Sequence, residues 1–95
     1  MPAIGVLTME LRIEHAHSLK EKRHVVKSLK ERLRHHHNIA IAEIDYQDLW
    51  QSSLISAVTV SSSRQLAEQV LQAVERDAVK EVGPMLISTT LEWVE

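Results

Sequence analysis

Residues 4–14 alternate between hydrophobic and polar side chains, and this alternation constrains the fold more than any other feature of the chain. The apolar members occupy every second position: Leu7, Met9, Leu11 and Ile13. Because side chains of a β-strand point alternately to its two faces, the pattern predicts a long strand with one buried face. Such a strand needs a second layer against its hydrophobic face, which the rest of the chain has to supply.

Two segments have helical periodicity. Ser18 and Glu21 have capping-box spacing, which predicts that the first helix starts at Ser18 and continues for about five turns. Ser62 and Gln65 repeat this spacing, and hydrophobic residues then recur with helical period up to the Gly-Pro pair at 83–84.

Apolar runs predict three further strands, at residues 39–44, 54–60 and 85–94. The resulting order, β-α-β-β-α-β, is that of ferredoxin-like domains. We therefore expect an α+β fold: a ferredoxin-like βαββαβ two-layer sandwich with a four-stranded antiparallel sheet and two helices on one face. Right-handed crossovers would place the first and third strands at the sheet centre. The other face stays open for self-association, with apolar patches expected from Ile4, Val6, Leu86 and Val94.

Length and composition indicate one small domain spanning residues 1–95. No apolar run reaches the roughly 20 residues of a membrane span, and no signal-peptide pattern precedes the first strand. We expect a cytoplasmic protein without membrane contact. The absence of Cys excludes disulfides, thiolate zinc sites and cysteine nucleophiles.

Charge is distributed unevenly along the chain. The net charge is −2, yet residues 12–38 hold eight of the 11 Lys and Arg residues, three of the 13 Asp and Glu residues, and all six His residues. This asymmetry predicts a basic face on an otherwise acidic body.

Five cations form a row on the first predicted helix, which we call the basic stripe: Lys20, Arg23, Lys27, Lys30 and Arg34. At about 100° per residue they share an arc of about 80°, and the row is about 20 Å long. This length matches several successive phosphates of a nucleic-acid strand. Base stacking on the sheet is not expected, because the predicted first and third strands contain no aromatic residue. A merely solvated helix face is the alternative interpretation, since charge runs often have only that role.

Lys22 falls near the centre of the apolar arc of the same helix. A buried ammonium group needs a partner, and the candidate carboxylates are Glu14, Glu43 and Asp45. We expect a structural ion pair rather than a catalytic lysine.

An acidic segment consisting of Glu43, Asp45 and Asp48 precedes Trp50. We expect its carboxylates to form salt bridges with the first helix or to recognise a basic partner. Trp50 is predicted to be an interface anchor, with a homodimer contact as its expected role.

No arrangement typical of an enzyme accompanies these residues. The carboxylates lack a nucleophile or oxyanion loop, and an acylphosphatase-like site would need a phosphate-binding loop with Arg at residues 14–18. The histidine cluster at 35–37 is expected to interact with the helix dipole rather than to bind metal. We therefore expect no enzyme, no metal and no cofactor.

The helix start "SLKEKR" and the segment "EIDYQDLW" resemble the marks of the YlxP-like family of small bacterial proteins of unknown function. The residues that carry the resemblance are Ser18, Leu19, Lys20, Lys22, Arg23, Glu43, Asp45, Asp48 and Trp50. The resemblance implies a ferredoxin-like fold and a bacterial source. Genes of the family tend to lie among those for translation factors, which implies a ribosome-linked role.

Two functions follow from these observations. The first is an RNA- or ribosome-associated accessory protein that contacts phosphates through the basic stripe. The second is a dimeric protein-interaction or regulatory module that uses the open sheet face and Trp50 and has no nucleic-acid role.

Overall fold

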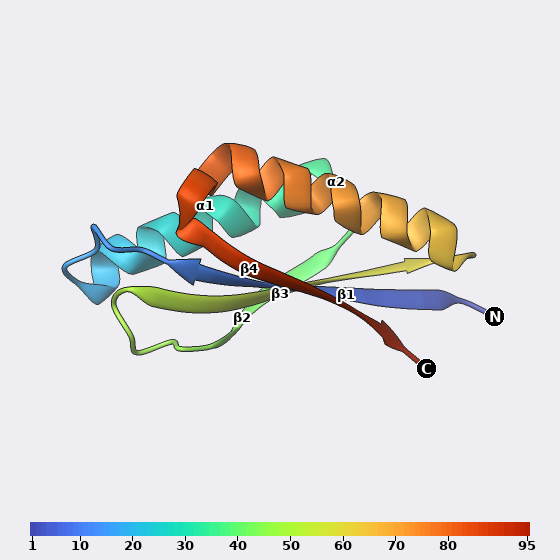
Figure 1. Cartoon of the computed structure of the whole chain (residues 1–95), viewed down its shortest axis with the longest axis horizontal. Coiled ribbons are helices and arrows are strands. Elements are labelled where there is room, and N and C mark those ends of the chain that lie inside the picture. The colour runs from blue at the N-terminus through green and yellow to red at the C-terminus, as the bar shows by residue number, and fades with distance from the viewer.

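A four-stranded antiparallel sheet carries two helices on one face in the computed structural model, which describes residues 1–95 (Figure 1). The elements are β1 (Ala3–Arg12), α1 (Leu19–His36), β2 (Ala40–Asp45), β3 (Ser52–Ser61), α2 (Arg64–Val82), a short 3-10 helix (Gly83–Met85) and β4 (Leu86–Val94). The strand order is β2-β3-β1-β4, so the first and third strands are central. This confirms the predicted ferredoxin-like βαββαβ fold.

Side chains that cap the helices fix where each helix begins. The Ser18 hydroxyl accepts a hydrogen bond from the Glu21 amide at 3.1 Å, and the Glu21 carboxylate accepts one from the His17 amide at 2.7 Å. At α2 the cap is Ser63, which accepts from the Leu66 amide at 3.2 Å. The prediction of Ser62 as the cap was therefore wrong by one residue. Three successive serines all have suitable hydroxyls, and β3 continues through Ser61 before the chain turns.

The core lies between the sheet and the helices. The alternating residues of β1 and its extension, Leu7, Met9, Leu11 and Ile13, are all nearly fully buried, as the sequence pattern predicts. β1 also approaches α2 closely at Gly5. A Cβ atom there would lie 2.8 Å from the end of the Leu71 side chain, so a larger residue would have to displace Leu71.

The opposite face of the sheet is not covered by any element of the chain (Figure 1). Ile4 pairs with both Val60 and Val94 across this face, and these two valines are 58% and 55% exposed. The prediction that Leu86 lies on this face was wrong. A β-bulge in β4 pairs Leu86 with Leu11, so its side chain packs against the core.

Neither helix has an apolar stretch long enough to span a lipid bilayer.

Candidate nucleic-acid interface on the first helix

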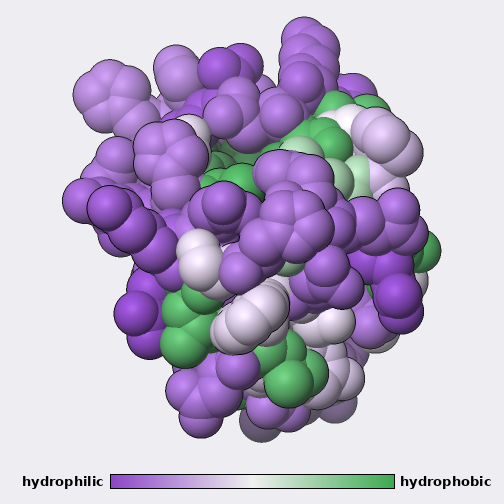
Figure 2. Space-filling model, turned by 90° about the vertical axis from the view of Figure 1, so that its left-hand side faces the viewer, coloured by the Kyte–Doolittle hydropathy of each residue, from purple (hydrophilic) through white to green (hydrophobic).

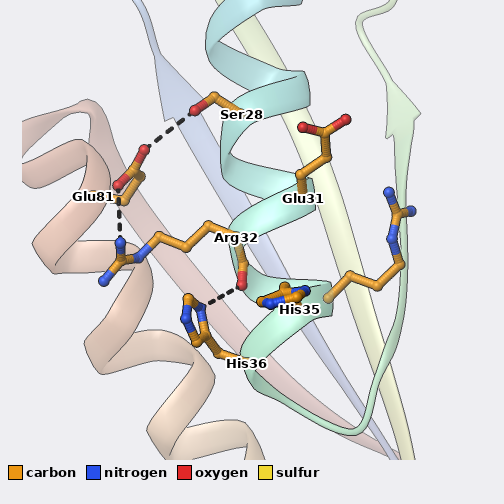
Figure 3. Close-up of a pocket in the computed structure, with 7 residues that line it drawn as sticks. Ser28, Glu31, Arg32, His35, His36 and Glu81 are labelled. Carbon is orange, nitrogen blue, oxygen red and sulfur yellow. Dashed lines mark hydrogen bonds and ion pairs between the residues drawn. The ribbon is translucent and has the colours of Figure 1, made fainter.

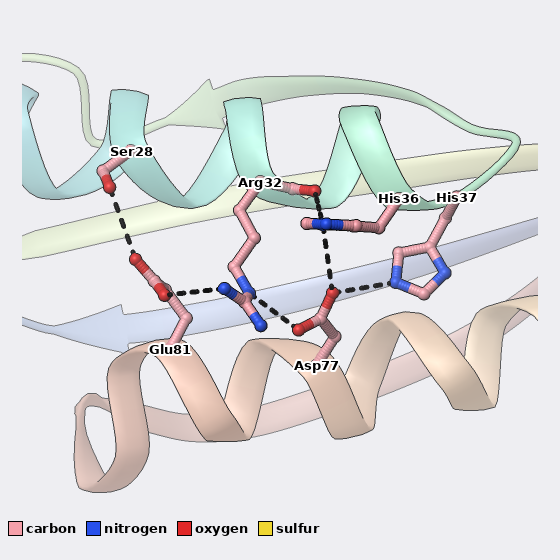
Figure 4. A network of polar contacts seen from close by, with 6 residues as sticks. All are labelled: Ser28, Arg32, His36, His37, Asp77 and Glu81. Atoms are coloured by element: carbon pink, nitrogen blue, oxygen red, sulfur yellow. Dashed lines mark hydrogen bonds and ion pairs between the residues drawn. The ribbon is translucent and has the colours of Figure 1, made fainter.

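Three faces of α1 have different surroundings. The buried row, Lys22, Val26, Leu29 and Leu33, faces the sheet. A second face meets α2, where the Ser28 hydroxyl donates to Glu81 at 3.3 Å and the Arg32 guanidinium donates to Asp77 at 2.7 Å (Figure 4). The remaining flank faces away from α2.

The basic stripe occupies this outer flank. With about 100° of rotation per residue, the stripe lies on the opposite side of the buried row from Arg32. Because α1 packs against the edge strand β2 while α2 packs against the central strands, the stripe lies along the outer border of the molecule. The sequence-predicted residues are therefore brought together on one surface.

Every cation of the stripe is free of ion pairs. Lys20, Arg23, Lys27 and Arg34 are exposed, and Lys30 is partly buried. None of the five lies within 4.0 Å of a carboxylate oxygen. A row of unpaired cations attracts polyanions, and its attraction weakens as salt is added.

A shallow polar hollow lies at the C-terminal half of α1, between α1 and α2 (Figure 3). Its volume is about 700 Å³, and no hydrophobic residue lines it. Its lining consists of Ser28, Glu31, Arg32, Arg34, His35, His36 and Glu81. Small-molecule pockets are mostly apolar, so this hollow is unlike a typical ligand site.

An ion-pair network joins the two helices beside the hollow (Figure 4). Asp77 is 12% exposed; it accepts from Arg32, and it lies 3.0 Å from the His37 ring and 4.0 Å from the His36 ring. Burial alone would raise the pKa of the Asp77 carboxyl, but hydrogen bonds from Arg32 and His37 outweigh burial and hold that pKa below its ordinary value. The hydrogen bond and charge of Asp77 raise the pKa of Arg32 in return.

Sequence analysis missed this network. The partners that it joins across the two helices are 40 or more residues apart in the chain, so no local motif contains them. The available signal was a matched spacing: Ser28 and Arg32 are four residues apart on α1, and Asp77 and Glu81 are four apart on α2. Side chains at this spacing share one helix face, and the two pairs face each other.

Lys22 is fully buried, and its partner is Glu43 rather than Glu14 or Asp45. The Lys22 ammonium lies 2.8 Å from the Glu43 carboxylate and donates to the Tyr46 carbonyl at 2.6 Å. The Ser53 hydroxyl donates to the same Glu43 oxygen at 2.6 Å. These contacts satisfy the buried ammonium and the partly buried carboxylate, which is what a structural pair requires.

The other acids of the predicted patch do not reach α1. Asp45 accepts from the Tyr46 amide at 2.8 Å, and Asp48 has no ion pair. Trp50 lies on the loop between β2 and β3 with 53% of its surface exposed. Its role as an interface anchor stays a prediction.

Five of the six histidines lie at the end of α1 or in the connection before it, and His24 lies within α1. The His36 ring lies 2.9 Å from the Arg32 carbonyl, in the position expected of a histidine near a helix C-terminus. No group of three or more His, Asp or Glu side chains comes together in a way that could hold a metal ion.

Two solved structures share the fold. The designed protein Foldit4 has a TM-score of 0.59 at 8% identity and covers 100% of this chain and 98% of its own. A dimeric ferredoxin-like protein of unknown function from Thermobifida fusca has a TM-score of 0.50 at 13% identity. The match covers 96% of this chain and 90% of that protein. At these identities the similarity concerns the fold alone.

Sequence comparisons identify the family. The uncharacterised protein YlxP of Bacillus subtilis (strain 168) is 45% identical over 71 residues, which are 75% of this chain and 77% of the relative. The model of the family described as "Protein of unknown function (DUF503)" matches residues 4–90. Both findings agree with the resemblance read from the motifs, and the chain belongs to this YlxP-containing DUF503 family.

Proposed function

We propose that this protein is a non-enzymatic accessory protein that binds RNA, in the setting of the ribosome, through the basic stripe. The observation that carries the proposal is the absence of partners for all five cations of the stripe. Lys22 and Arg32, on the same helix, both have carboxylate partners. The five cations of the stripe are thus all the remaining Lys and Arg residues of α1, and they occupy one flank of the helix.

The expected mode of binding is contact with the phosphate backbone. The ends of the stripe, Lys20 and Arg34, are 14 positions apart, which corresponds to about 20 Å of helix and to several phosphates. The central strands β1 and β3 carry no aromatic side chain on which bases could stack. Affinity is therefore expected to depend on salt and on RNA shape more than on base sequence.

The ribosomal setting and a cytoplasmic location rest on the family resemblance, because genes of the family tend to lie among those for translation factors. The non-enzymatic part of the proposal is supported by the hollow beside α1, where ion pairs already occupy Arg32 and Glu81.

A homodimer is the second candidate, and the open sheet face favours it. Val60 and Val94 are more than half exposed there, on either side of Ile4. The similar protein from Thermobifida fusca is described as dimeric. In this alternative the two sheets cover each other, and the stripe only keeps the dimer soluble.

The test is a titration of labelled structured RNA and single-stranded RNA over a salt series. Wild type is compared with Lys27→Glu/Lys30→Glu and with the control Arg76→Glu/Lys80→Glu, which makes the same charge change on α2. We expect the stripe variant to lose at least about tenfold in affinity and to reduce the slope of log K against log salt by about 2. The control should retain most of its binding.

An acidic protein serves as a competing polyanion without phosphates. Equal losses in both variants would mean that only net charge matters, and unchanged binding in the stripe variant would remove the stripe from the site. In either case sedimentation velocity on Val60→Glu/Val94→Glu would test the dimer next.

A further inference from the structure

The loop between β2 and β3, residues 46–51, forms a second exposed surface whose character is opposite to that of the stripe. Three hydrophobic side chains at this end of the hairpin are about half exposed: Ile44 at 50%, Leu49 at 51% and Trp50 at 53%. Asp45 and Asp48 lie among them in the chain, and neither makes an ion pair. Exposed hydrophobic side chains beside free acids mark the surface as a candidate protein contact.

The loop lies at the lower left of Figure 1, below the sheet and at the end of the molecule where α1 begins. Figure 2 views that end of the molecule. This surface is mostly hydrophilic, with hydrophobic atoms exposed in its lower half and also at its upper right. Ile44, Leu49 and Trp50 are each about half exposed, so no other element of the chain fully covers them.

The first half of the loop is held from inside by Lys22. Its buried ammonium donates to the Tyr46 carbonyl at 2.6 Å and lies 3.4 Å from the Gln47 carbonyl. Tyr46 adopts a positive φ of 65°, which is unfavourable for a residue with a side chain. The Asp45 carboxylate accepts the Tyr46 amide at 2.8 Å and helps to stabilise that conformation.

The second half is held by Gln51. Its side-chain amide donates to the carbonyls of Glu14 and Ala16 at 3.0 and 3.1 Å, and its own carbonyl accepts from the Ile13 amide at 2.9 Å. The loop is thus fixed at both ends by hydrogen bonds to α1 and to the β1–α1 connection. Its conformational entropy is already lost on folding, which favours binding by a preorganised surface.

We infer that this loop docks a basic protein: a partner segment that presents apolar side chains flanked by Lys or Arg. Trp50 and Leu49 would supply the buried apolar contact, and tryptophan is the residue type most enriched at binding hot spots. Asp45 and Asp48 would pair with the cations of the partner. This inference goes beyond the proposed RNA binding and uses none of the residues of the stripe.

A second copy of the chain fits this surface less well. The strongest cationic surface of the chain is the stripe, but α1 exposes no large hydrophobic side chain that could meet Trp50. The exposed hydrophobic side chains elsewhere are Met1, Val60 at the end of β3, and residues of α2 and β4, all outside the stripe. The stripe therefore lacks the apolar side chains that would meet Trp50, which favours another protein as the partner.

The experiment measures binding of labelled synthetic peptides by fluorescence anisotropy. The probe is a 14-residue peptide of interspersed Lys and Leu, and the comparison peptides replace all Leu by Ser or all Lys by Glu. The variant Leu49→Ser/Trp50→Ser removes the apolar contact, and the control Leu66→Ser/Val79→Ser removes two equally exposed hydrophobic side chains from α2. Thermal unfolding checks that both variants are folded.

We expect wild type to bind the Lys-Leu peptide and neither comparison peptide. The loop variant should lose at least about tenfold in affinity while the control binds as wild type does. Asp48→Asn should weaken binding about threefold and reduce its salt dependence, because it removes one charge pair. RNA affinity should be unchanged in the loop variant, which separates this inference from the proposed function.

Two results would overturn the inference. Equal peptide affinity in the loop variant and the α2 control would show that the loop is not the binding surface. Loss of wild-type self-association in the loop variant, measured by sedimentation velocity, would assign the loop to a homodimer contact instead.

Discussion

The two flanks of α1 carry cations in opposite states. On the flank that meets α2, Arg32 pairs with Asp77 and Glu81, and the His37 ring, just beyond the end of α1, lies against Asp77. On the outer flank the five cations of the stripe have no carboxylate partner. The same helix therefore uses some cations to dock its neighbour and leaves others for solvent or a ligand. The difference shows that a cation of α1 forms an ion pair where a neighbouring element presents a carboxylate, whatever the density of charge around that cation.

The largest effect should come from the buried cation between these flanks. Lys22→Ala removes the only cation that pairs with the largely buried Glu43 carboxylate, leaving it the Ser53 hydroxyl as its remaining donor, and it opens a cavity where the Lys22 side chain was. We expect the free energy of unfolding to fall by about 3–5 kcal/mol, the range for breaking one side of a buried pair. Urea denaturation monitored by circular dichroism measures the change.

The matched control is Lys27→Ala, on the outer flank of the same helix. Its free energy of unfolding should stay within about 0.5 kcal/mol of wild type, since Lys27 is exposed and unpaired. Similar losses in the two variants would contradict the distinction between paired and unpaired cations of α1.

An intermediate effect is expected from the network between the helices. Asp77→Asn removes the charge that Arg32 and His37 share, although its amide can still accept one hydrogen bond. We expect a loss of about 1–2 kcal/mol in the free energy of unfolding at neutral pH. Glu75→Gln, which changes the same charge on α2 without a partner in the network, is the control.

The pH dependence of unfolding sharpens this prediction. Because the pKa of Asp77 is lower in the folded chain than its ordinary value of 3.8, its contribution is present above that value and is lost as pH falls through the folded pKa. Wild type should therefore lose more stability than Asp77→Asn on acidification below about pH 4. Parallel curves for the two proteins would show that the ion pair contributes nothing to stability.

The sequence predicted those features that depend on local patterns. The alternation through Leu7 and Met9 identified the first strand, and the spacing of Ser18 and Glu21 located the first helix. Strand order followed because the sequence of elements allows few topologies. The need of Lys22 for a partner was also predictable, since it interrupts an apolar arc.

Features that depend on distant contacts or on one extra residue were not predictable. Glu43 could be chosen over other acids only once β2 was known to lie beneath α1. The bulge in β4 shifts the face of Leu86 by one residue and leaves no mark in the hydrophobic pattern. The sequence predicted that the cations of the stripe form a row. Only the structure shows that Asp77 and Glu81 pair with Arg32, on the other flank.

The smallest effect on stability should come from reversing charge on the stripe. In Lys27→Glu/Lys30→Glu we expect the free energy of unfolding to stay within about 0.5 kcal/mol of wild type, because neither lysine makes an ion pair. At low salt the variant should even be slightly more stable, since it relieves repulsion between neighbouring cations at i, i+3 and i, i+4. Added salt should then remove this difference by screening. A loss above about 1 kcal/mol would mean that the stripe stabilises the fold, and its free cations could no longer be explained by a ligand.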